Sequence, residues 1–523
     1  MSVTRRSNPR TALAQLQLLL VVVVTACSPA SNETDTTTVE STVRPLMIGT
    51  MGMPPSQGNP FGAVGPPSST VWLALFDGLT QLDGEGKLAP GLALKWNAVD
   101  EHTWRFELRP GVRFSNGNTF NAAAVVRLVN WMTSQPGRAS LVGNELRNVA
   151  GAEALDDLTV LIRTAEPDAI LPGRLSAVLM VEPETWEQLG PDGFGGAPVG
   201  TGPYYIEDWN RSANTLVAKR NPYSWRQPHI DEIHFIALID QSVRLQALLS
   251  GDIDLAIIGL EGKDQLRERG YRLVTAPGMA VMGVALVANR KDGAPATDVR
   301  VRQALNYAID RQAIAKNILG NPQQAAGQPA ARGTFGYDPG LPPFPYDPDK
   351  AKRLFAEAGF PEGFDFVLDI VIDATPGDAD IYQMVAQYLN AVGVRTTLRV
   401  RLFSAWLQDY TAGTWSSDAF TLAWNAAPYN DVQRPMEYYS CARPVPFFCD
   451  RAMSAKLAAA AGEFDVEKRE ALLQELSREY RQAAPTIFLV ENHMTWGAHP
   501  RIDHVSIANR VYEYEKITFR GEP

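Results

Sequence analysis

Residues 298–311 read DVRVRQALNYAIDR. The apolar residues Ala304, Leu305, Ala308 and Ile309 recur at the spacing of one helix face, and Asp298 is a favourable N-cap residue. Gly320 is the first residue beyond this pattern that is a typical helix terminator. We therefore expect one long helix that begins after residue 298 and ends near residue 320.

Helix and strand patterns alternate on both sides of this segment. A helical pattern begins at Ser242 and spans 242–251. The apolar run over 253–258 that follows it predicts a buried strand. Downstream, Pro348 opens a helix that ends before Gly359. This alternation predicts α/β lobes whose sheets are covered by helices. Further helices are expected from 121, 381, 450 and 465, and further strands at 104–109, 394–400, 420–424 and 486–490.

Length and composition place the chain among ordinary globular proteins. Its 523 residues correspond to roughly three to four domains. The 45% hydrophobic and 20% charged residues exclude collagen-like, mucin-like and wholly disordered chains. A net charge of −10 argues against nucleic acid as a partner, because nucleic-acid binders usually carry a basic surplus.

The N-terminus has the layout of a secretory signal. Arg5, Arg6 and Arg10 precede an apolar run over 11–24, and small residues follow it. The run is shorter than the roughly 20 residues that a membrane-spanning helix needs, so a transmembrane anchor is the less favoured alternative. We therefore expect residues 1–26 to be a signal peptide. No other stretch of the sequence approaches 18 consecutive apolar residues.

The end of this segment, residues 24–27 (VTAC), resembles the bacterial lipobox. The resemblance implies that the Cys27 thiol is acylated, that Cys27 becomes the first residue of the mature protein, and that lipid alone holds the protein at the membrane. Residues 27–43 are rich in Ser and Thr, and we expect a flexible tether there. Cys441 and Cys449 are the remaining cysteines, and a disulfide between them is the default expectation in an oxidising compartment.

The sequence offers no motif of a common enzyme class. It contains no phosphate-binding loop of the G-x-x-x-x-G-K-[ST] type, no G-x-S-x-G elbow and no H-E-x-x-H zinc motif. The six histidines lack metal-ligand spacing, and no two carboxylates stand out as an acid–base couple. We therefore expect neither catalysis nor a cofactor or metal, and an exported hydrolase is the less favoured alternative.

Further motifs surround the segment at 298–311. They are 75–80 (LFDGLT), 87–93 (KLAPGLA), 103–114 (TWRFELRPGVRF), 198–204 (PVGTGPY), 220–223 (RNPY), 248–254 (LLSGDID) and 351–359 (AKRLFAEAG). Together, and in this order, they resemble the extracytoplasmic solute-binding proteins of the peptide/nickel type, family 5, which serve ABC importers. Most of these residues belong to turns, capped helices and interlobe packing, so they identify the fold rather than the ligand site.

The resemblance implies an α/β, two-lobed periplasmic-binding-protein-like fold with a hinge and an extra domain on lobe I. Lobe I would comprise 44–77, 196–277 and 487–523, the extra domain 78–195, and lobe II 278–486. The implied function is capture of a solute, most of all an oligopeptide or dipeptide, by a periplasmic or other extracytoplasmic monomer that delivers it to ABC permease and ATPase subunits. A sensor or chaperone on the same fold is a further alternative.

In peptide-binding members the ligand lies between two chain edges, which match 51–61 and 420–429 here. Many members carry an Asp three residues beyond the Trp that matches Trp424, and it anchors the α-ammonium group of the peptide. This chain has Ala427 at that position. Asp431 is the candidate that could bind the ammonium group instead. The alternative is that Asp431 is a solvent-exposed acid in a turn. A blocked peptide, a sugar, an opine-like compound or a modified amino compound therefore stays open as the ligand.

Other candidate ligand contacts are aromatic and amide residues near the expected cleft. Aromatic rings can form the walls of a cleft, and amides can hydrogen-bond a peptide backbone. The same residue types also serve as core residues and turn caps. The candidates are Gln57, Asn59, Asn289, Trp406, Trp424, Asn425, Tyr429 and Tyr438.

Overall fold

The computed structural model describes residues 44–521, except 64, 66, 291, 292, 373 and 509. The expected signal peptide, the tether and Cys27 lie outside the described residues. Within the described part of the chain, no helix combines the length and the apolar character that crossing a bilayer requires.

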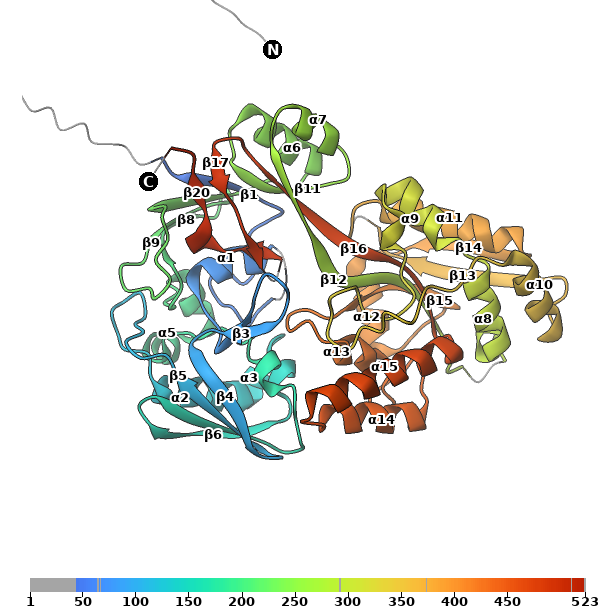
Figure 1. The fold of residues 1–523 in the computed structure, drawn as a ribbon, viewed down its shortest axis with the longest axis horizontal. Coiled ribbons are helices and arrows are strands. Elements are labelled where there is room, and N and C mark those ends of the chain that lie inside the picture. The colour runs from blue at the N-terminus through green and yellow to red at the C-terminus, as the bar shows by residue number, and fades with distance from the viewer. Residues whose placement is uncertain are drawn as a thin grey trace, which may run out of the picture. The chain divides into compact units, whose positions relative to one another are not determined.

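A ten-stranded mixed sheet runs through the described chain (Figure 1). Its parallel pairs need long crossover connections, and helices supply them. In spatial order the strands are β14 (Val394–Val400), β13 (Phe364–Ile370), β15 (Ala419–Asn425), β12 (Arg272–Leu286), β16 (Thr486–Ala498), β11 (Leu255–Ile258), β1 (Leu46–Thr50), β10 (Glu232–Ala237), β9 (Thr215–Arg220) and β8 (Tyr204–Asn210).

Strands β12 and β16 are long and antiparallel, and they run through both parts of this sheet. The first part of β12 pairs with the last part of β16, which also pairs with β11. The last part of β12 pairs with the first part of β16 on one side and with β15 on the other. The register shifts between Pro277 and Val281. At this break a β-carbon on Gly278 would meet the backbone oxygen of Asn492 at 1.6 Å, so only glycine permits the crossing. These two strands therefore connect the two parts of the sheet.

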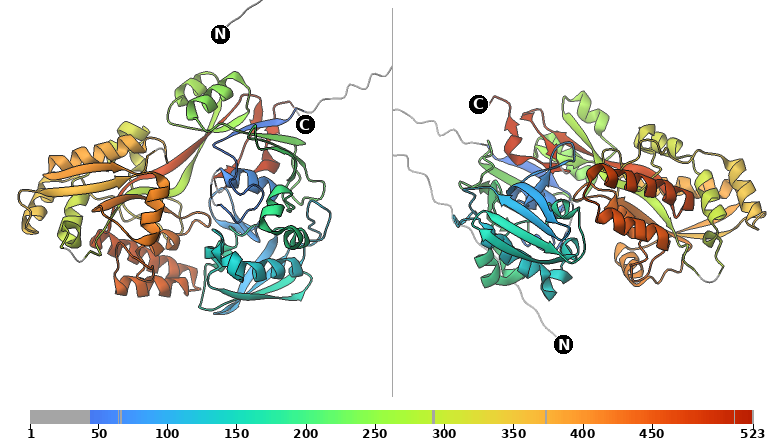
Figure 2. Two further views of the ribbon diagram at one scale, coloured as in Figure 1. Left: turned by 180° about the vertical axis from the view of Figure 1, so that it is seen from behind. Right: turned by 60° about the horizontal axis from the view of Figure 1, so that its bottom comes forward.

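In lobe II the strands separate two apolar cores, because successive side chains of a strand point to opposite faces. In β12, Val284 belongs to one core, whereas Val281 and Ala285 belong to the other. The first core includes residues of α8 (Val299–Tyr307), α9 (Arg311–Leu319), α10 (Pro348–Glu357) and α11 (Asp378–Ala391). The second includes residues of α12 (Phe403–Ala412), α13 (Gln433–Met436), α14 (Arg451–Ala461) and α15 (Val466–Ala483). Helices α14 and α15 lie side by side (Figure 2).

The other part of the sheet has its own helices and is followed by the chain's C-terminal segment. Its helices are α1 (Ser68–Leu75), α6 (Gln241–Ser250) and α7 (Lys263–Glu268). Two small antiparallel sheets follow β16, formed by β17 (Ile502–His504) with β20 (Thr518–Phe519) and by β18 (Ile507–Ala508) with β19 (Val511–Tyr512). Arg510 lies in the turn between β18 and β19.

The extra domain has its own four-stranded antiparallel sheet, in the order β4 (Ala93–Asp100), β5 (Thr103–Leu108), β7 (Thr159–Thr164) and β6 (Val149–Asp156). The hairpin of β2 (Thr80–Leu82) and β3 (Leu88–Pro90) precedes it. The helices of this region are α2 (Ala122–Thr133), α3 (Gln135–Ala139), α4 (Leu171–Arg174) and α5 (Pro183–Gly196). Short 3-10 helices are η1 (Gly143–Leu146), η2 (Pro295–Thr297), η3 (Pro322–Gln324), η4 (Glu437–Tyr439) and η5 (Tyr514–Lys516).

The structure corrects the sequence prediction at two helices. The expected long helix after residue 298 is divided into α8 and α9, because Asp310 caps a second helix by accepting the Ala313 N–H. The helix expected over 242–251 begins one residue earlier, and its N-cap is Asp240. The other predicted elements are present, and β16 extends well beyond the predicted strand at 486–490.

Candidate functional site

A cavity of about 140 Å³ lies where residues 425–428 face the chain around α1. Strand β15 ends at Asn425, whose Oδ1 accepts the Ala427 N–H and turns the chain. The next peptide bond, between Ala427 and Pro428, is cis. Parts of the chain that are far apart in the sequence contribute to the walls, which include Pro60, Trp72, Glu145, Ser176, Asn425, Ala427, Pro428, Arg434 and Arg510.

The segment 51–61 contributes Pro60 to this cavity, and polar groups of Gln57 and Asn59 make hydrogen bonds within the protein. The Gln57 carbonyl accepts the indole N–H of Trp72 at 2.8 Å, which fixes that indole at the cavity wall. Asn59 Oδ1 accepts the backbone N–H two residues further along, at 3.0 Å. Neither Gln57 nor Asn59 is among the residues that line the cavity.

The charged residues that line the cavity are Glu145, Arg434 and Arg510. Arg434 donates from Nη1 to the Asn425 carbonyl at 2.8 Å, and its Nη2 lies 3.4 Å from Glu145 Oε1. Arg510 donates from Nη1 to the Gly278 carbonyl at 3.0 Å, and it has no carboxylate partner in the described part of the chain. Burial lowers the pKa of Arg510 to about 10, and the positive charge of Arg434 contributes to this shift.

A buried ion network continues from Glu145 away from the cavity. Arg174 lies 3.6 Å from the Glu145 carboxylate, 3.4 Å from Asp168 and 3.2 Å from Glu437. Arg147 pairs with the same Glu437 at 2.8 Å. Four of these residues lie between positions 145 and 174 and Glu437 follows α13, so the network connects these two parts of the chain beside the cavity.

The candidate tryptophans pack inside lobe II and do not line the cavity. The Trp424 side chain is fully buried, and it packs against Tyr438 and Tyr439 with ring centroids 6.5 and 6.2 Å away. Trp406 is buried as well and stacks on Tyr410 at 5.1 Å. The structure thus places these rings in the second lobe II core.

Tyr429 and Asp431 line a separate cavity of about 730 Å³. The Tyr429 hydroxyl lies 3.4 Å from Nη1 of Arg174. Asp431 accepts hydrogen bonds from both Nη atoms of Arg469, at 2.6 and 3.0 Å. Both oxygens of Asp431 are therefore engaged by a buried cation. Aromatic side chains of this second cavity are Trp96, Trp104, Phe335, Tyr337 and Phe464.

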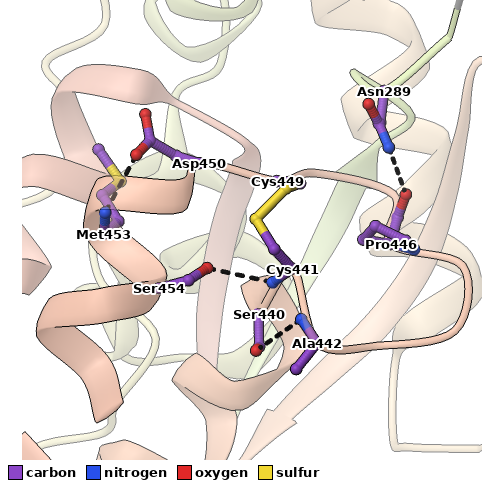
Figure 3. Close-up of a disulfide and its surroundings, with 9 residues drawn as sticks. All are labelled: Asn289, Ser440, Cys441, Ala442, Pro446, Cys449, Asp450, Met453 and Ser454. Atoms are coloured by element: carbon purple, nitrogen blue, oxygen red, sulfur yellow. Dashed lines mark hydrogen bonds between the residues drawn. A yellow bond between two sulfur atoms is a disulfide. The ribbon is translucent and has the colours of Figure 1, made fainter. Parts of the chain in front are cut away.

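Asn289 lies near the loop that Cys441 and Cys449 close (Figure 3). Its Nδ2 donates to the Pro446 carbonyl at 3.3 Å, and its side chain lies outside the cavity that segment 425–428 lines. The structure joins Cys441 to Cys449 with a Cα–Cα distance of 4.9 Å. Among the described residues, no group of His, Cys, Asp or Glu is arranged to hold a metal ion.

Of the residues predicted from the sequence, Asn425 and Ala427 line the cavity, whereas its charged residues were not predicted. Glu145, Arg434 and Arg510 are far apart along the chain and belong to no motif with a fixed spacing. The fold brings them together by crossing between the extra domain, lobe II and the C-terminal segment. The only sequence signal was the missing acid at Ala427, which pointed to a different ligand chemistry but not to the residues that supply it.

Comparison with known proteins supports the observed fold. Residues 87–444 match a family profile described as bacterial extracellular solute-binding proteins, family 5 middle. The glutathione-binding protein GsiB of Salmonella typhimurium is 29% identical over 461 residues, which cover 83% of this chain and 86% of that protein.

Two solved structures show the same fold at low sequence identity. The periplasmic binding protein DppA from Helicobacter pylori, in complex with the peptide STSA, has a TM-score of 0.74 at 22% identity and covers 91% of this chain and 98% of its own. AgaA from A. tumefaciens R10, in complex with agropinic acid, has a TM-score of 0.72 at 22% identity and covers 88% of this chain and 94% of its own. The predicted two-lobed α/β fold class is confirmed.

Proposed function

The chain belongs to the bacterial extracellular solute-binding proteins of family 5, and we propose that its solute is peptide-like and that the 140 Å³ cavity at segment 425–428 holds one terminal group of it. As a member of this family it is the substrate-binding component of an ABC importer, it acts outside the cytoplasm with permease and ATPase subunits, and it is not an enzyme.

The main support for this site is that residues of the predicted lobe I, extra domain and lobe II all line this cavity. Pro60 and Trp72 come from lobe I, Glu145 and Ser176 from the extra domain, and Arg434 from lobe II. A solute that contacts both lobes stabilises the closed state over the open state, because only the closed state presents both sets of contacts.

The chemistry of the solute is proposed from the relatives. One relative is named for glutathione binding, and one solved structure holds the peptide STSA. Another holds agropinic acid, which keeps a non-peptide solute as the second candidate. The absence of an acid at Ala427 favours solutes that do not rely on a free α-ammonium group.

Mass spectrometry of the small molecules that co-purify with the protein, followed by calorimetric titration, tests this proposal. The titrated panel is glutathione, the peptide STSA and agropinic acid. We expect Ala427→Trp to abolish binding because it fills the cavity, whereas Leu402→Trp, at an exposed position, should bind as the wild type does. A solute that binds Ala427→Trp with unchanged affinity would place the site elsewhere.

We further propose that lipid at Cys27 anchors the mature protein, that it is a monomer, and that Cys441 and Cys449 are oxidised. The lipobox-like residues 24–27 and the Ser/Thr-rich segment 27–43 support the anchor. Cys27→Ser should release the protein from the membrane fraction; a normally processed variant that stays in the membrane contradicts the anchor. A thiol assay of denatured, unreduced mature protein should detect no free thiol at Cys441 or Cys449.

A further inference from the structure

We infer that the cavity at segment 425–428 binds a carboxylate group of the solute, with Arg510 and Arg434 as the residues that select for it. This inference rests on the proposed function, since it specifies the solute class of the same site. It is carried by an unbalanced charge, by unused donors on Arg510 and by the scarcity of groups that could bind an ammonium.

The charges around the cavity do not balance. Arg434 and Arg510 face one lining carboxylate, Glu145, which also lies 3.6 Å from Arg174. Following the network further does not remove the surplus: Arg147, Arg174 and Arg434 pair with Glu145, Asp168 and Glu437. Asp83 and Glu85 line a neighbouring cavity that Arg510 also lines, but neither forms an ion pair with it. One positive charge is left without a counter-charge among the described residues, and a half-buried cation in that position favours an anion.

Arg510 has the free donors that an anion needs. Within the described residues its guanidinium makes one hydrogen bond, from Nη1 to the Gly278 carbonyl. Its Nε is buried and has no partner. Nε and Nη2 point to the same side of a guanidinium and form the fork that a carboxylate binds in a bidentate manner. The existing bond to Gly278 therefore orients Arg510 and leaves Nη2 as its accessible unpaired donor, whereas Nε is buried and completes the fork only when the guanidinium turns toward the solute.

The same cavity offers little to an ammonium group. Ala427 stands where an acid would bind it, and Glu145 is shared by Arg434 and Arg174. Backbone pairing is limited too, because Ala426 N–H donates to a carbonyl of β12, Ala427 N–H donates to Asn425 Oδ1, and Pro428 has no N–H. Recognition in this wall therefore depends on the arginine side chains.

The placement of the two arginines also connects carboxylate binding to closure. Arg510 lies in the C-terminal segment of lobe I, and Arg434 lies on α13 of lobe II. Two cations that approach each other in an empty cavity repel, and an anion between them turns this repulsion into attraction to both lobes. A carboxylate would thus favour the closed state, whereas an amide or ester at the same position would leave the repulsion in place.

Thermal denaturation of the mature protein tests the inference with three probes at matched ionic strength: glutathione, glutathione diethyl ester and succinate. The diethyl ester keeps the free amine of glutathione and lacks its charged carboxylates. We expect glutathione and succinate to raise the melting temperature of the wild type and the ester to do so far less. In Arg510→Gln the apparent affinity for glutathione should fall about 10- to 100-fold.

Two further variants keep the result interpretable. Arg443→Gln is the matched control, because Arg443 is another half-buried arginine whose Nε has no partner, and it stacks on Tyr410 outside the cavity. It should respond to all probes as the wild type does. Arg510→Lys keeps the charge but loses the fork, so it should retain part of the response even if Arg510→Gln folds poorly.

Each outcome separates the inference from the proposed function. Equal stabilisation by glutathione and its ester, or an unchanged response to glutathione and succinate in both Arg510 variants, overturns the carboxylate site while leaving a peptide-like solute in place. A response to succinate that depends on Arg510, without any response to glutathione, STSA or other peptides, supports the anion site and overturns the peptide-like solute. No response of the wild type to any carboxylate overturns the inference.

Discussion

Two buried charged clusters flank the segment that ends β15, and they differ in one respect. In the first, Asp431 and Arg469 form a bidentate pair in which both oxygens of the acid are occupied. In the second, Arg434 and Arg510 line the cavity. Glu145, which pairs with Arg434, is the one carboxylate among the described residues that line it. The first cluster is complete without a ligand, whereas in the second we propose that an anion of the solute supplies the missing negative charge.

This difference separates a structural role from a binding role. A complete ion pair that is fully buried contributes to stability only as long as both partners remain, and removing one leaves an isolated charge. A cation with unused donors gains hydrogen bonds when a ligand arrives. We therefore expect substitutions in the two clusters to affect different measurements.

The largest effect is expected at the complete pair. Asp431→Asn removes the negative charge and leaves Arg469 buried without a counter-charge, so the free energy of unfolding should fall by about 3–5 kcal/mol. Urea denaturation measures this change. The double variant Asp431→Leu/Arg469→Met should recover part of the loss because no charge is left unpaired. A loss of solute affinity in Asp431→Asn without a loss of stability would make Asp431 a ligand residue after all.

A smaller loss of stability is expected at the disulfide loop, whose cysteines belong to neither cluster. Replacing Cys441 and Cys449 by Ser opens a loop with a sequence separation of 8 residues. The free energy of unfolding should fall by about 2–3 kcal/mol in the chain-entropy description of cross-links. The preference of the folded protein for carboxylate over ester should not change. A changed preference would show that the loop shapes the cavity.

The smallest effect is expected at the exposed end of the network. Burial raises the pKa of Glu437, but Arg174 and Arg147 outweigh it, and the net pKa lies below the ordinary value of 4.5. Arg147→Gln removes a half-exposed partner, so stability at pH 7 should fall by less than about 1 kcal/mol.

The pH dependence of this difference follows from the depressed pKa. A carboxyl with a lowered folded-state pKa contributes stability above its unfolded pKa and loses that contribution as pH falls through the folded pKa. The wild type and Arg147→Gln should therefore converge in stability as pH falls from about 5 to below the folded pKa of Glu437. Denaturation curves at several pH values check this, and a difference that stays constant down to acid pH would mean that Glu437 is not its source.

Much of the fold could be predicted from local patterns. Asp298, Asp347, Asp450 and Asp465 each cap a helix as expected, because an N-cap needs only a short polar side chain at the right position. The division of the long helix was missed, although Asp310 is a second cap residue within it. A continuous apolar face concealed the break, which the structure shows at the Asp310 cap and at Arg311, whose side chain donates to the Phe488 carbonyl of β16.

The site was predictable only in part. The family resemblance pointed to Asn425 and Ala427, which line the cavity, because a strand end has a fixed place in the fold. It could not identify Arg510, since the position of this residue depends on a turn that the C-terminal segment brings back to the crossing strands. Aromatic residues were selected by type, and Trp424 shows why type is insufficient: a large ring serves a core as well as a cleft.

The most direct test of this account is a thermodynamic cycle by isothermal titration calorimetry. Wild type and Arg510→Gln are each titrated with glutathione and with its diethyl ester, so that the coupling between the guanidinium and the ligand carboxylates is isolated from other effects. The account predicts a favourable coupling free energy of about 1.5–3 kcal/mol, the range of hydrogen bonds to charged groups. A coupling of zero, with glutathione bound equally well by both proteins, would contradict it.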